Sequence, residues 1–309
     1  MTVVLGIVAP VFLIIALGYA AAKRGHVDPA GFKGLNAFAF SLAAPALLFL
    51  GGTTGAVGGG RAALAFFVGT AAVYAATLFA ARRFGGRPLG AAGMLALDAT
   101  FGNTVMMGIP LVTAAFGAEA LAVLLAILAL HSMVLLGTAT VVAEIGLHAR
   151  APWRRVLRAT VSGVGRNPVV MAVAAALAWR LLGLPAPPGF ARRALELLGA
   201  AGPPVALFCL GGSLAALDPR AAWRETLAAG SLKLFVLPAA VWAACLLLGV
   251  PRFETAVTVL VAALPTGANA YLLAQRYRIE ADRSGATVLV TTAVSVLTLS
   301  ALLAWLRAG

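Results

Sequence analysis

The chain has 309 residues, of which 62% are hydrophobic and 11% are charged. Soluble domains are about half apolar and about a quarter charged, so this composition excludes an ordinary soluble domain and indicates a protein of the lipid bilayer. The formal net charge of +13 would suggest a nucleic-acid partner in a soluble protein, but here the basic residues lie in short clusters between apolar stretches. That arrangement is typical of residues that orient membrane proteins, so we expect no nucleic-acid partner.

Ten stretches of the chain are long and apolar enough to span a bilayer, which takes about 20 residues per helix. In chain order they are residues 2–22, 33–52, 61–82, 88–117, 119–146, 160–183, 190–217, 225–249, 252–276 and 283–307. The connections between them are short and often contain Gly or Pro, so no soluble domain fits between two stretches. The first stretch has no basic residues before it, and we interpret it as an uncleaved helix rather than a signal peptide.

The basic residues alternate between the two sides of the predicted membrane. Most lie in the connections after the first, third, fifth, seventh and ninth stretches, for example Arg276, Arg278 and Arg283. The largest group is Arg150 to Arg166. Because cytoplasmic loops carry the excess of Lys and Arg, both termini are predicted to lie outside. An even number of spans requires the termini to share one side, which agrees. The richness in Ala, Gly and Arg suggests a bacterial genome, so we expect a bacterial inner membrane.

Three short motifs occur in both halves of the chain in the same order. APVFL resembles NPVVM, PALLFLGGT resembles PVALFCLGGS, and GNTVMMGIP is matched by LPTGAN, each about 155–159 residues later. We therefore predict two repeats of five helices, residues 1–150 and 151–309. Since five is odd, the second repeat must be inserted upside down, an architecture that many secondary transporters use.

The motifs GNTVMMGIP and LPTGAN predict interruptions in the fourth and ninth helices. Pro110 and Pro265 each remove a backbone donor and clash with the carbonyl four residues earlier. The nearby Gly102, Gly108 and Gly267 offer little resistance to opening. Irregular backbone at membrane depth survives only inside protein or around a cavity. Two broken helices in matching positions are therefore predicted to form a transport site near the middle of the membrane.

The polar residues of these motifs suit an anion. An opened helix exposes N–H groups at the start of its second half, and these carry a partial positive charge. Asn103 and Asn269 can donate hydrogen bonds without a charge to desolvate, and Thr104 and Thr266 add hydroxyl groups. The alternative is that proline only kinks the two helices and that Asn and Thr satisfy the freed backbone groups.

Two charged residues lie well inside predicted helices. Asp98 of the fourth helix and Lys233 of the eighth lie about 12–15 Å from the same side, at about 1.5 Å per residue. We hypothesise that they face each other beside the broken helices, with His131 of the fifth helix nearby, and that Asp98 is a candidate proton carrier. The alternatives are an ion pair that only cancels charge, or a lysine that extends to the membrane surface.

No pattern in the sequence indicates a cofactor or a metal site. Cys209 and Cys245 lie in apolar stretches and are interpreted as small buried residues, and the 3 histidines lack metal-binding spacing. A nucleotide-binding GxxxxGK[ST] motif is absent, so we expect that the chain does not hydrolyse nucleotide.

Five strings together carry a resemblance to a known family: FGNTVMMGIPL, RNPVVMAVAAAL, LELLGAAGPPVALFCLGGSLA, SLKLFVLPAAVW and LPTGANAYLLAQRY. They resemble the auxin efflux carrier family, which includes bacterial malate and malonate permease-like proteins and the plant PIN-type carriers. The resemblance covers nearly the whole chain, and the strings of the fourth and ninth helices are the most specific.

The resemblance implies a homodimer of ten-helix chains. Helices one, two, six and seven would form a scaffold, and helices three to five and eight to ten a transport domain in which helices four and nine cross at their prolines. Asn103, Pro110 and Pro265 match the crossing of the family, and Asn269 matches its bacterial pattern. Lys233 matches a helix-eight lysine whose acidic partner in PIN-type carriers comes from helix three. That helix has no charge here between residues 62 and 81, which makes Asp98 the substitute partner.

These features predict a secondary transporter of a small organic anion, such as malate, malonate or an auxin-like acid, working by alternating access. One alternative is an ion-coupled symporter or antiporter of another solute, such as a bile acid-like anion or sodium itself. A membrane receptor is another, because a ligand site that never cycles has the same sequence features. An intramembrane enzyme would need paired Asp residues, a His cluster or a Ser–His pair, and none is visible.

Overall fold

The structure, a computed structural model, describes residues 2–54, 59–147, 168–220 and 222–308. Within these residues every regular element is a helix, and the only β-type pairing is one antiparallel bridge between Gly102 and Thr266. The expectation of an all-helical membrane protein is therefore confirmed over these ranges. The predicted basic group from Arg150 to Arg166 lies outside the described residues.

Of the described helices, 7 are long and apolar enough to cross a membrane. They correspond to the first, second, third, fifth, seventh, eighth and tenth predicted stretches. The fourth and ninth stretches each consist of two shorter helices, and the sixth begins among residues outside the described ranges. The chain is thus a multi-pass membrane protein, while the inverted pair of five-helix repeats, 1–150 and 151–309, remains a prediction.

The helices pack into two compact units, and each unit draws on both halves of the chain. Unit 1 comprises Met1–Gly59, Val105–Ala129 and Val164–Ala216, and unit 2 comprises Gly60–Thr104, Leu130–Gly163 and Leu217–Gly309. The long helix α7 (Leu121–Leu147) belongs to unit 1 in its first part and to unit 2 in the rest.

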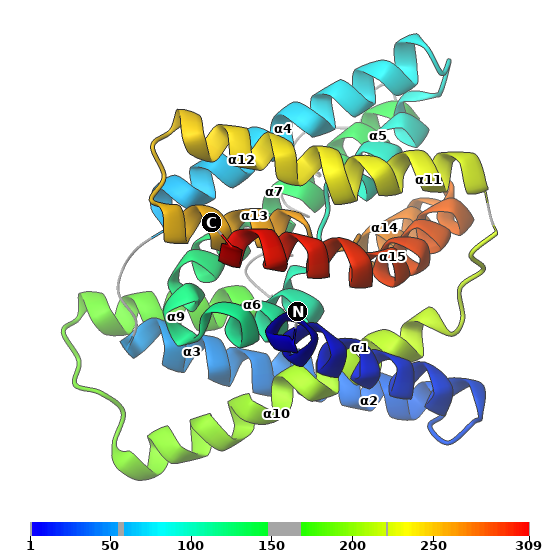
Figure 1. The fold of residues 1–309 in the computed structure, drawn as a ribbon. Coiled ribbons are helices and arrows are strands. Elements are labelled where there is room, and N and C mark those ends of the chain that lie inside the picture. The colour runs from blue at the N-terminus through cyan, green and yellow to red at the C-terminus, as the bar shows by residue number, and fades with distance from the viewer. Residues whose placement is uncertain (1, 55–58, 148–167, 221, 309) are drawn as a thin grey trace. The chain divides into compact units, whose positions relative to one another are not determined.

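Unit 1 is built around α1 and α10, which pack along each other (Figure 1). Its other described helices are α2, α3, α6 and α9; the bounds of the six are Thr2–Lys23 (α1), Pro29–Phe38 (α2), Ala44–Thr54 (α3), Ile109–Phe116 (α6), Pro168–Leu181 (α9) and Gly189–Leu214 (α10). A Cβ atom on Gly18 would overlap the carbonyl group of Phe208, and one on Gly211 would overlap that of Ile15. Small residues therefore allow the backbones of α1 and α10 to touch, as is common in membrane helix pairs.

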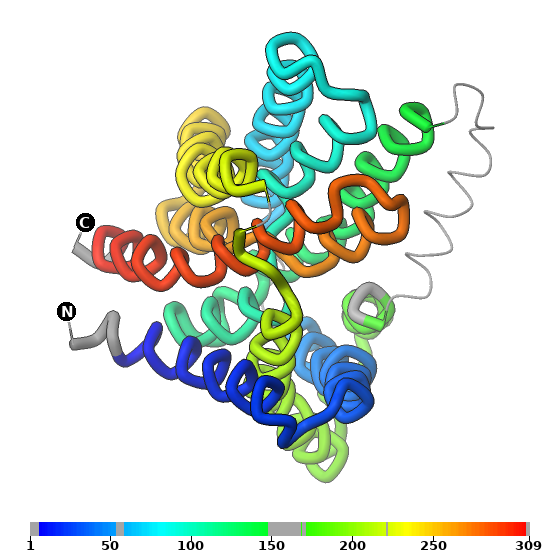
Figure 2. Tube along the Cα trace, turned by 90° about the vertical axis from the view of Figure 1, so that its right-hand side faces the viewer, coloured from blue at the N-terminus to red at the C-terminus, as the bar shows by residue number. Residues whose placement is uncertain are grey.

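Unit 2 contains the second part of α7 and seven further helices: Gly60–Arg83 (α4), Leu89–Asp98 (α5), Trp223–Ser231 (α11), Leu237–Leu247 (α12), Arg252–Ala262 (α13), Ala268–Tyr277 (α14) and Ala281–Ala308 (α15). Helix α4 packs along α12, and α15 packs along both α11 and α14, as Figure 1 and the turned view in Figure 2 show. A cluster of buried side chains around Leu97 and Phe101 joins α4, α5, α7 and α14. This cluster fixes the end of α5, where the site described below begins.

Three prolines each follow a π-helical segment inside a longer helix: Ala39–Ala43 before Pro45, Thr104–Gly108 before Pro110, and Leu232–Val236 before Pro238. In the third segment the N–H of Leu237 donates to the carbonyl of Leu232, five residues earlier instead of four. Proline supplies no N–H, and its ring displaces the carbonyl four residues back, so the turn before it widens.

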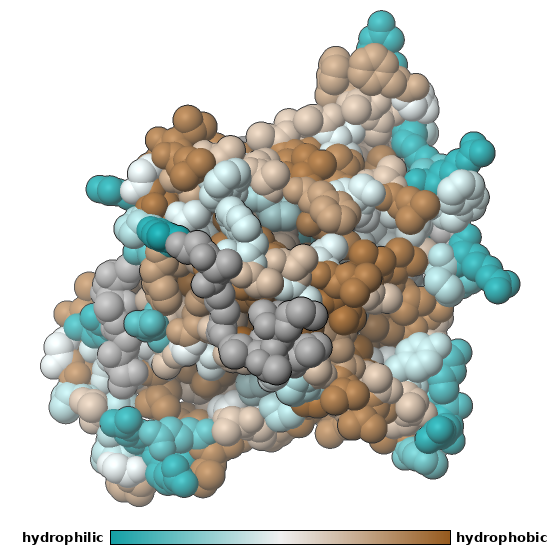
Figure 3. Space-filling view, viewed as in Figure 1, coloured by the Kyte–Doolittle hydropathy of each residue, from teal (hydrophilic) through white to brown (hydrophobic). Residues whose placement is uncertain are grey.

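The exposed surface has the character of a membrane protein. On the visible face in Figure 3, hydrophobic residues predominate along the helices and hydrophilic residues gather near helix ends. Large exposed apolar side chains occur in both units, among them Leu13, Leu17, Phe79, Leu247 and Leu297. Such side chains are stable in contact with lipid and would be costly in water.

Candidate functional site

Two interrupted helices of unit 2 meet through their backbones. Helix α5 ends at Asp98 and helical structure resumes at Thr104, while α13 ends at Ala262 and α14 begins at Ala268. The N–H of Asn103 donates to the carbonyl of Pro265 over 2.9 Å, and the N–H of Gly267 donates to the carbonyl of Phe101 over 2.9 Å. These reciprocal bonds form the bridge between Gly102 and Thr266 and satisfy backbone groups that the breaks would otherwise leave unpaired.

The reciprocal bonds lie on either side of the bridge. They join Asn103 to Pro265 and Phe101 to Gly267, with Gly102 opposite Thr266 between them. The sequence alignment of GNTVMMGIP, which ends at Pro110, with LPTGAN at Pro265 stays a prediction. Proline lacks an N–H, and Pro265 loses nothing in an open stretch where no helical bond is available.

Pro110 does not open its helix. It lies in the first turn of α6, in the part of the chain that belongs to unit 1, and its local effect is the π-helical segment that contains Gly108. The fourth helix is instead interrupted between Asp98 and Thr104, where no proline occurs. Of the predicted site residues, Gly108 and Pro110 therefore lie outside unit 2.

Two buried polar atoms at the crossing, the place where residues 99–103 and 263–267 meet, have no hydrogen-bond partner. They are the amide nitrogen Nδ2 of Asn103 and the ring nitrogen Nε2 of His131 on α7. The other ring nitrogen of His131 lies 3.4 Å from the hydroxyl of Thr104, and the His131 ring lies 4.6 Å from the ring of Phe101. Buried polar groups in native proteins are nearly always paired, so unpaired ones beside a helix break indicate where a ligand can bind.

Lys233 lies beside the crossing and is fully buried. Its ammonium group donates to the carbonyl of Ala262, the last residue of α13, over 2.6 Å. A Cβ atom on Gly102 would lie 3.6 Å from the same ammonium group. A cation at the carboxyl end of a helix is favourable, because that end carries a partial negative charge.

Asp98 pairs with Arg283 and not with Lys233. A guanidinium nitrogen of Arg283 on α15 lies 3.3 Å from Oδ2 of Asp98, and the hydroxyl of Ser284 donates to Oδ1 over 2.6 Å. The predicted pair of Asp98 and Lys233 is therefore wrong. The reason is the rotation of the helices: Asp98, at the end of α5, is turned toward α15, whereas Lys233 is turned toward the end of α13.

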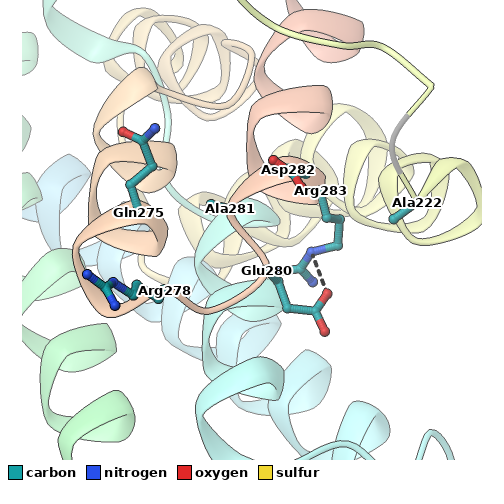
Figure 4. A pocket seen from close by; sticks show the side chains of 7 residues that line it. All are labelled: Ala222, Gln275, Arg278, Glu280, Ala281, Asp282 and Arg283. Carbon is teal, nitrogen blue, oxygen red and sulfur yellow. Dashed lines mark ion pairs between the residues drawn. The ribbon is translucent and has the colours of Figure 1, made fainter.

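Arg283 was assigned from the sequence to a basic connection, yet its side chain is only 1% exposed. The sequence did contain a signal for the burial of Arg283. An acidic residue inside the membrane requires a cationic partner, and Arg283 is the first residue of a predicted span. A second ion pair joins its Nε to Glu280 at 3.5 Å, and Glu280 in turn pairs with Arg87, which also contacts Glu225. In Figure 4 the side chains of Glu280 and Arg283 meet in a pocket of about 680 Å³ that Gln275 and Arg278 also line.

The remaining predicted residues have distinct positions in unit 2. The hydroxyl of Thr266 donates to the carbonyl of Asp98 over 2.8 Å, and its N–H donates to the hydroxyl of Thr291 over 3.1 Å. Asn269 lies in the first turn of α14 and is exposed. Among the residues that the structure describes, no group of three or more His, Cys, Asp or Glu side chains could hold a metal ion.

Comparison with known proteins assigns the chain to a family. The family described as "Membrane transport protein" matches residues 3–145 and 148–303. A protein of Rhizobium meliloti (strain 1021) named "Putative malonate transporter" is 30% identical over 318 residues, which cover 100% of this chain and 98% of that protein. The chain therefore belongs to the membrane transport protein family of the auxin efflux carrier type.

Proposed function

We propose that the chain is a secondary transporter of a small organic anion, a mono- or dicarboxylate such as malonate or malate, and that the anion binds at the crossing in unit 2. The observation that carries the proposal is the pair of helix breaks joined by reciprocal backbone bonds, with the unpaired amide of Asn103 beside them. Family membership and the name of the Rhizobium meliloti relative support a carboxylate as the substrate.

The chemistry of the crossing suits a carboxylate. Helix α14 begins at Ala268, directly after the break, and no side chain caps its first N–H groups. These N–H groups carry a partial positive charge and form a site for an anion, as in transporters built on discontinuous helices. The amide of Asn103 would add a neutral donor, and Lys233 would add a positive charge close by.

The proposal extends to the architecture. The reciprocal exchange between residues 101–103 and 265–267 has the local symmetry that an inverted repeat would produce, which supports ten spans arranged as two repeats of five. Unit 2 would carry the anion during alternating access and unit 1 would be the scaffold. By similarity to the family, we also propose that unit 1 forms a homodimer.

Uptake by proteoliposomes tests the function. We expect purified protein to take up labelled malonate or malate, with indole acetate as a further test substrate. Asn103→Ala should weaken malonate binding by about tenfold or more, the loss of one hydrogen bond to a charged group, or roughly 1.5–3 kcal/mol. Its unfolding temperature should stay near that of the wild type, because Nδ2 of Asn103 has no partner in the protein.

Asn36→Ala is the matched control, since Asn36 is an exposed residue of α2 in unit 1. Uptake and affinity should be unchanged in this variant. A folded wild-type protein that takes up no carboxylate would contradict the proposed function. Unchanged affinity in Asn103→Ala would place the binding site away from the crossing.

A further inference from the structure

The buried charges of unit 2 do not balance. Among the described residues, the fully buried charged side chains besides the histidine are Asp98, Lys233 and Arg283, with a formal sum of one positive charge. An uncompensated charge inside the membrane is expensive. A monoanion at the crossing would cancel the surplus. A dicarboxylate in its dianionic form would leave one negative charge, which one additional proton would cancel.

Asp98 offers an atom that can accept this proton. Its Oδ1 receives the hydrogen bond of Ser284, whereas no hydrogen bond is donated to its Oδ2. Arg283 approaches Oδ2 at 3.3 Å without forming a hydrogen bond. A carboxylate at the end of α5 is also poorly placed, because the carboxyl end of a helix repels negative charge. Arg283 offsets that repulsion only through the charge of its guanidinium group.

A route connects Asp98 to the surface of unit 2. Arg283 lies between Asp98 and Glu280, and the side chain of Glu280 is 33% exposed in the pocket of Figure 4. Three nitrogens of Arg283 have no hydrogen-bond acceptor, so the guanidinium group is not fixed to either carboxylate. When Asp98 is neutral, Arg283 retains an ionic partner in Glu280.

Asp98 is also linked to the crossing through the backbone. Its carbonyl accepts the hydrogen bond of Thr266, the bridge residue of the second break, and the N–H of Thr266 donates to Thr291 of α15. Arg283 and Ser284 belong to the same helix. A change in the charge of Asp98 therefore acts on α15 and on the bridge at once.

We propose that Asp98 takes up one proton at Oδ2 for each dicarboxylate dianion that binds at the crossing, which makes the chain a proton–dicarboxylate symporter. This inference rests on the proposed function. A hydronium ion that reaches the pocket gives its proton to the carboxylate of Asp98 and leaves as water, and the reverse step occurs on the other side of the membrane. Arg283 is a positioning residue: it holds the ionised carboxylate and releases it on protonation.

Several other titratable groups lie on the elements around α5. Helix α4 contributes Tyr74, whose hydroxyl contacts the carbonyl of Gly93 at 3.4 Å. Helix α11 contributes Glu225, which pairs with Arg87, and α14 contributes Tyr277, which donates to Glu144. From α15 and the turn before it come Arg283, Asp282 and Glu280, and beyond the breaks lie Lys233 and His131.

The test measures the number of protons that enter with each malonate. Proteoliposomes loaded with a pH-sensitive dye report proton entry while labelled malonate reports uptake. We expect about one proton per malonate for the wild type and a ratio near zero for Asp98→Asn, an isosteric change that removes the acceptor. Glu196→Gln is the matched control, because Glu196 is a carboxylate of unit 1 paired with Arg192 and Arg193, and its ratio should equal that of the wild type.

If Asp98→Asn does not transport malonate, the proton uptake that accompanies malonate binding can be measured in detergent solution instead. Wild-type protein titrated with malonate in weakly buffered detergent solution should take up about one proton per bound malonate, Asp98→Glu should do the same, and Asp98→Asn should take up none. Arg283→Gln should shift the pH at which uptake is half-maximal, an effect that a purely structural role would not cause.

The outcomes separate this inference from the proposed function. Malonate uptake without proton entry, or uptake driven by a sodium gradient, would overturn the symport and leave the carboxylate transporter in place. An unchanged proton ratio in Asp98→Asn would also overturn it. If the folded wild type takes up no carboxylate, both proposals are wrong.

Discussion

At the scale of single residues, the backbone of the crossing leaves room for a side chain at one glycine and none at another. A Cβ atom on Gly267 would lie 2.8 Å from the ring of Phe101 and 2.9 Å from the carbonyl oxygen of Gly102. A Cβ atom on Gly102 would have its nearest neighbours at 3.5 Å, an ordinary contact. Gly102 therefore has room for a Cβ atom, whereas Gly267 does not.

We predict that Gly267→Ala is harmful and that Gly102→Ala is tolerated. The new methyl group at residue 267 must push against backbone, so the unfolding free energy should fall by roughly 1–3 kcal/mol, as in other overpacked cores, and malonate uptake should fall with it. Thermal unfolding in detergent and initial uptake rates measure both effects. Equal stability of the two variants would show that the backbones of the crossing can move apart freely.

At the scale of the element, proline acts by widening a turn as well as by breaking a helix. The π-helical segment Leu232–Val236 before Pro238 contains Lys233, and so the direction of that side chain depends on the widened turn. A π-helical turn contains about one residue more than an α-helical turn, and each residue of an α-helix turns the chain by about 100°. If the segment became a regular α-helix, Lys233 would therefore rotate away from the carbonyl of Ala262.

We predict that Pro238→Ala lowers malonate uptake by roughly tenfold, the equivalent of about 1.4 kcal/mol of lost binding, because alanine restores the N–H and permits a regular helix. Initial uptake rates at several malonate concentrations measure the change. Pro10→Ala is the control, since Pro10 is exposed inside the continuous helix α1. Wild-type uptake by Pro238→Ala would mean that packing alone maintains the widened turn.

At the scale of the whole molecule, charge decides how the chain is inserted. The basic residues Arg82, Arg83 and Arg87 follow or end α4, and the distribution of basic residues predicts that this connection faces the cytoplasm. The end of α12 at Leu247 should then face the outside. Both connections belong to unit 2, so one labelling experiment can compare them.

We predict opposite labelling of two single cysteines placed in a Cys209→Ala, Cys245→Ala background. Phe84 and Leu247 are 79% and 87% exposed, so burial does not limit either position. A membrane-impermeant maleimide should label Leu247→Cys in intact bacterial cells and Phe84→Cys only after the membrane is permeabilised. The reverse pattern would contradict the predicted orientation, with both termini outside.

Much of the fold could be predicted from the sequence, because the patterns that specify membrane helices are local. A run of apolar residues is sufficient to predict a membrane helix, and all seven long described spans agree with predicted stretches. The breaks in the fourth and ninth helices were also predicted, but the first was placed at Pro110 instead of between Asp98 and Thr104. Gly102 and Asn103 marked this stretch as irregular, but the limits of the break depend on the bridge to Thr266, a residue far away in the chain.

The sequence by itself determined that this protein is helical and lies in the membrane, and that two of its helices are interrupted. It also placed Asp98 and Lys233 inside predicted spans. Only the tertiary structure decided that Asp98 pairs with Arg283, that Lys233 binds the carbonyl of Ala262, and that Asn103 binds the carbonyl of Pro265. The physical reason is that hydrophobic burial acts along each helix separately. Pairing depends on how each helix is rotated about its axis and on which distant helix packs against it.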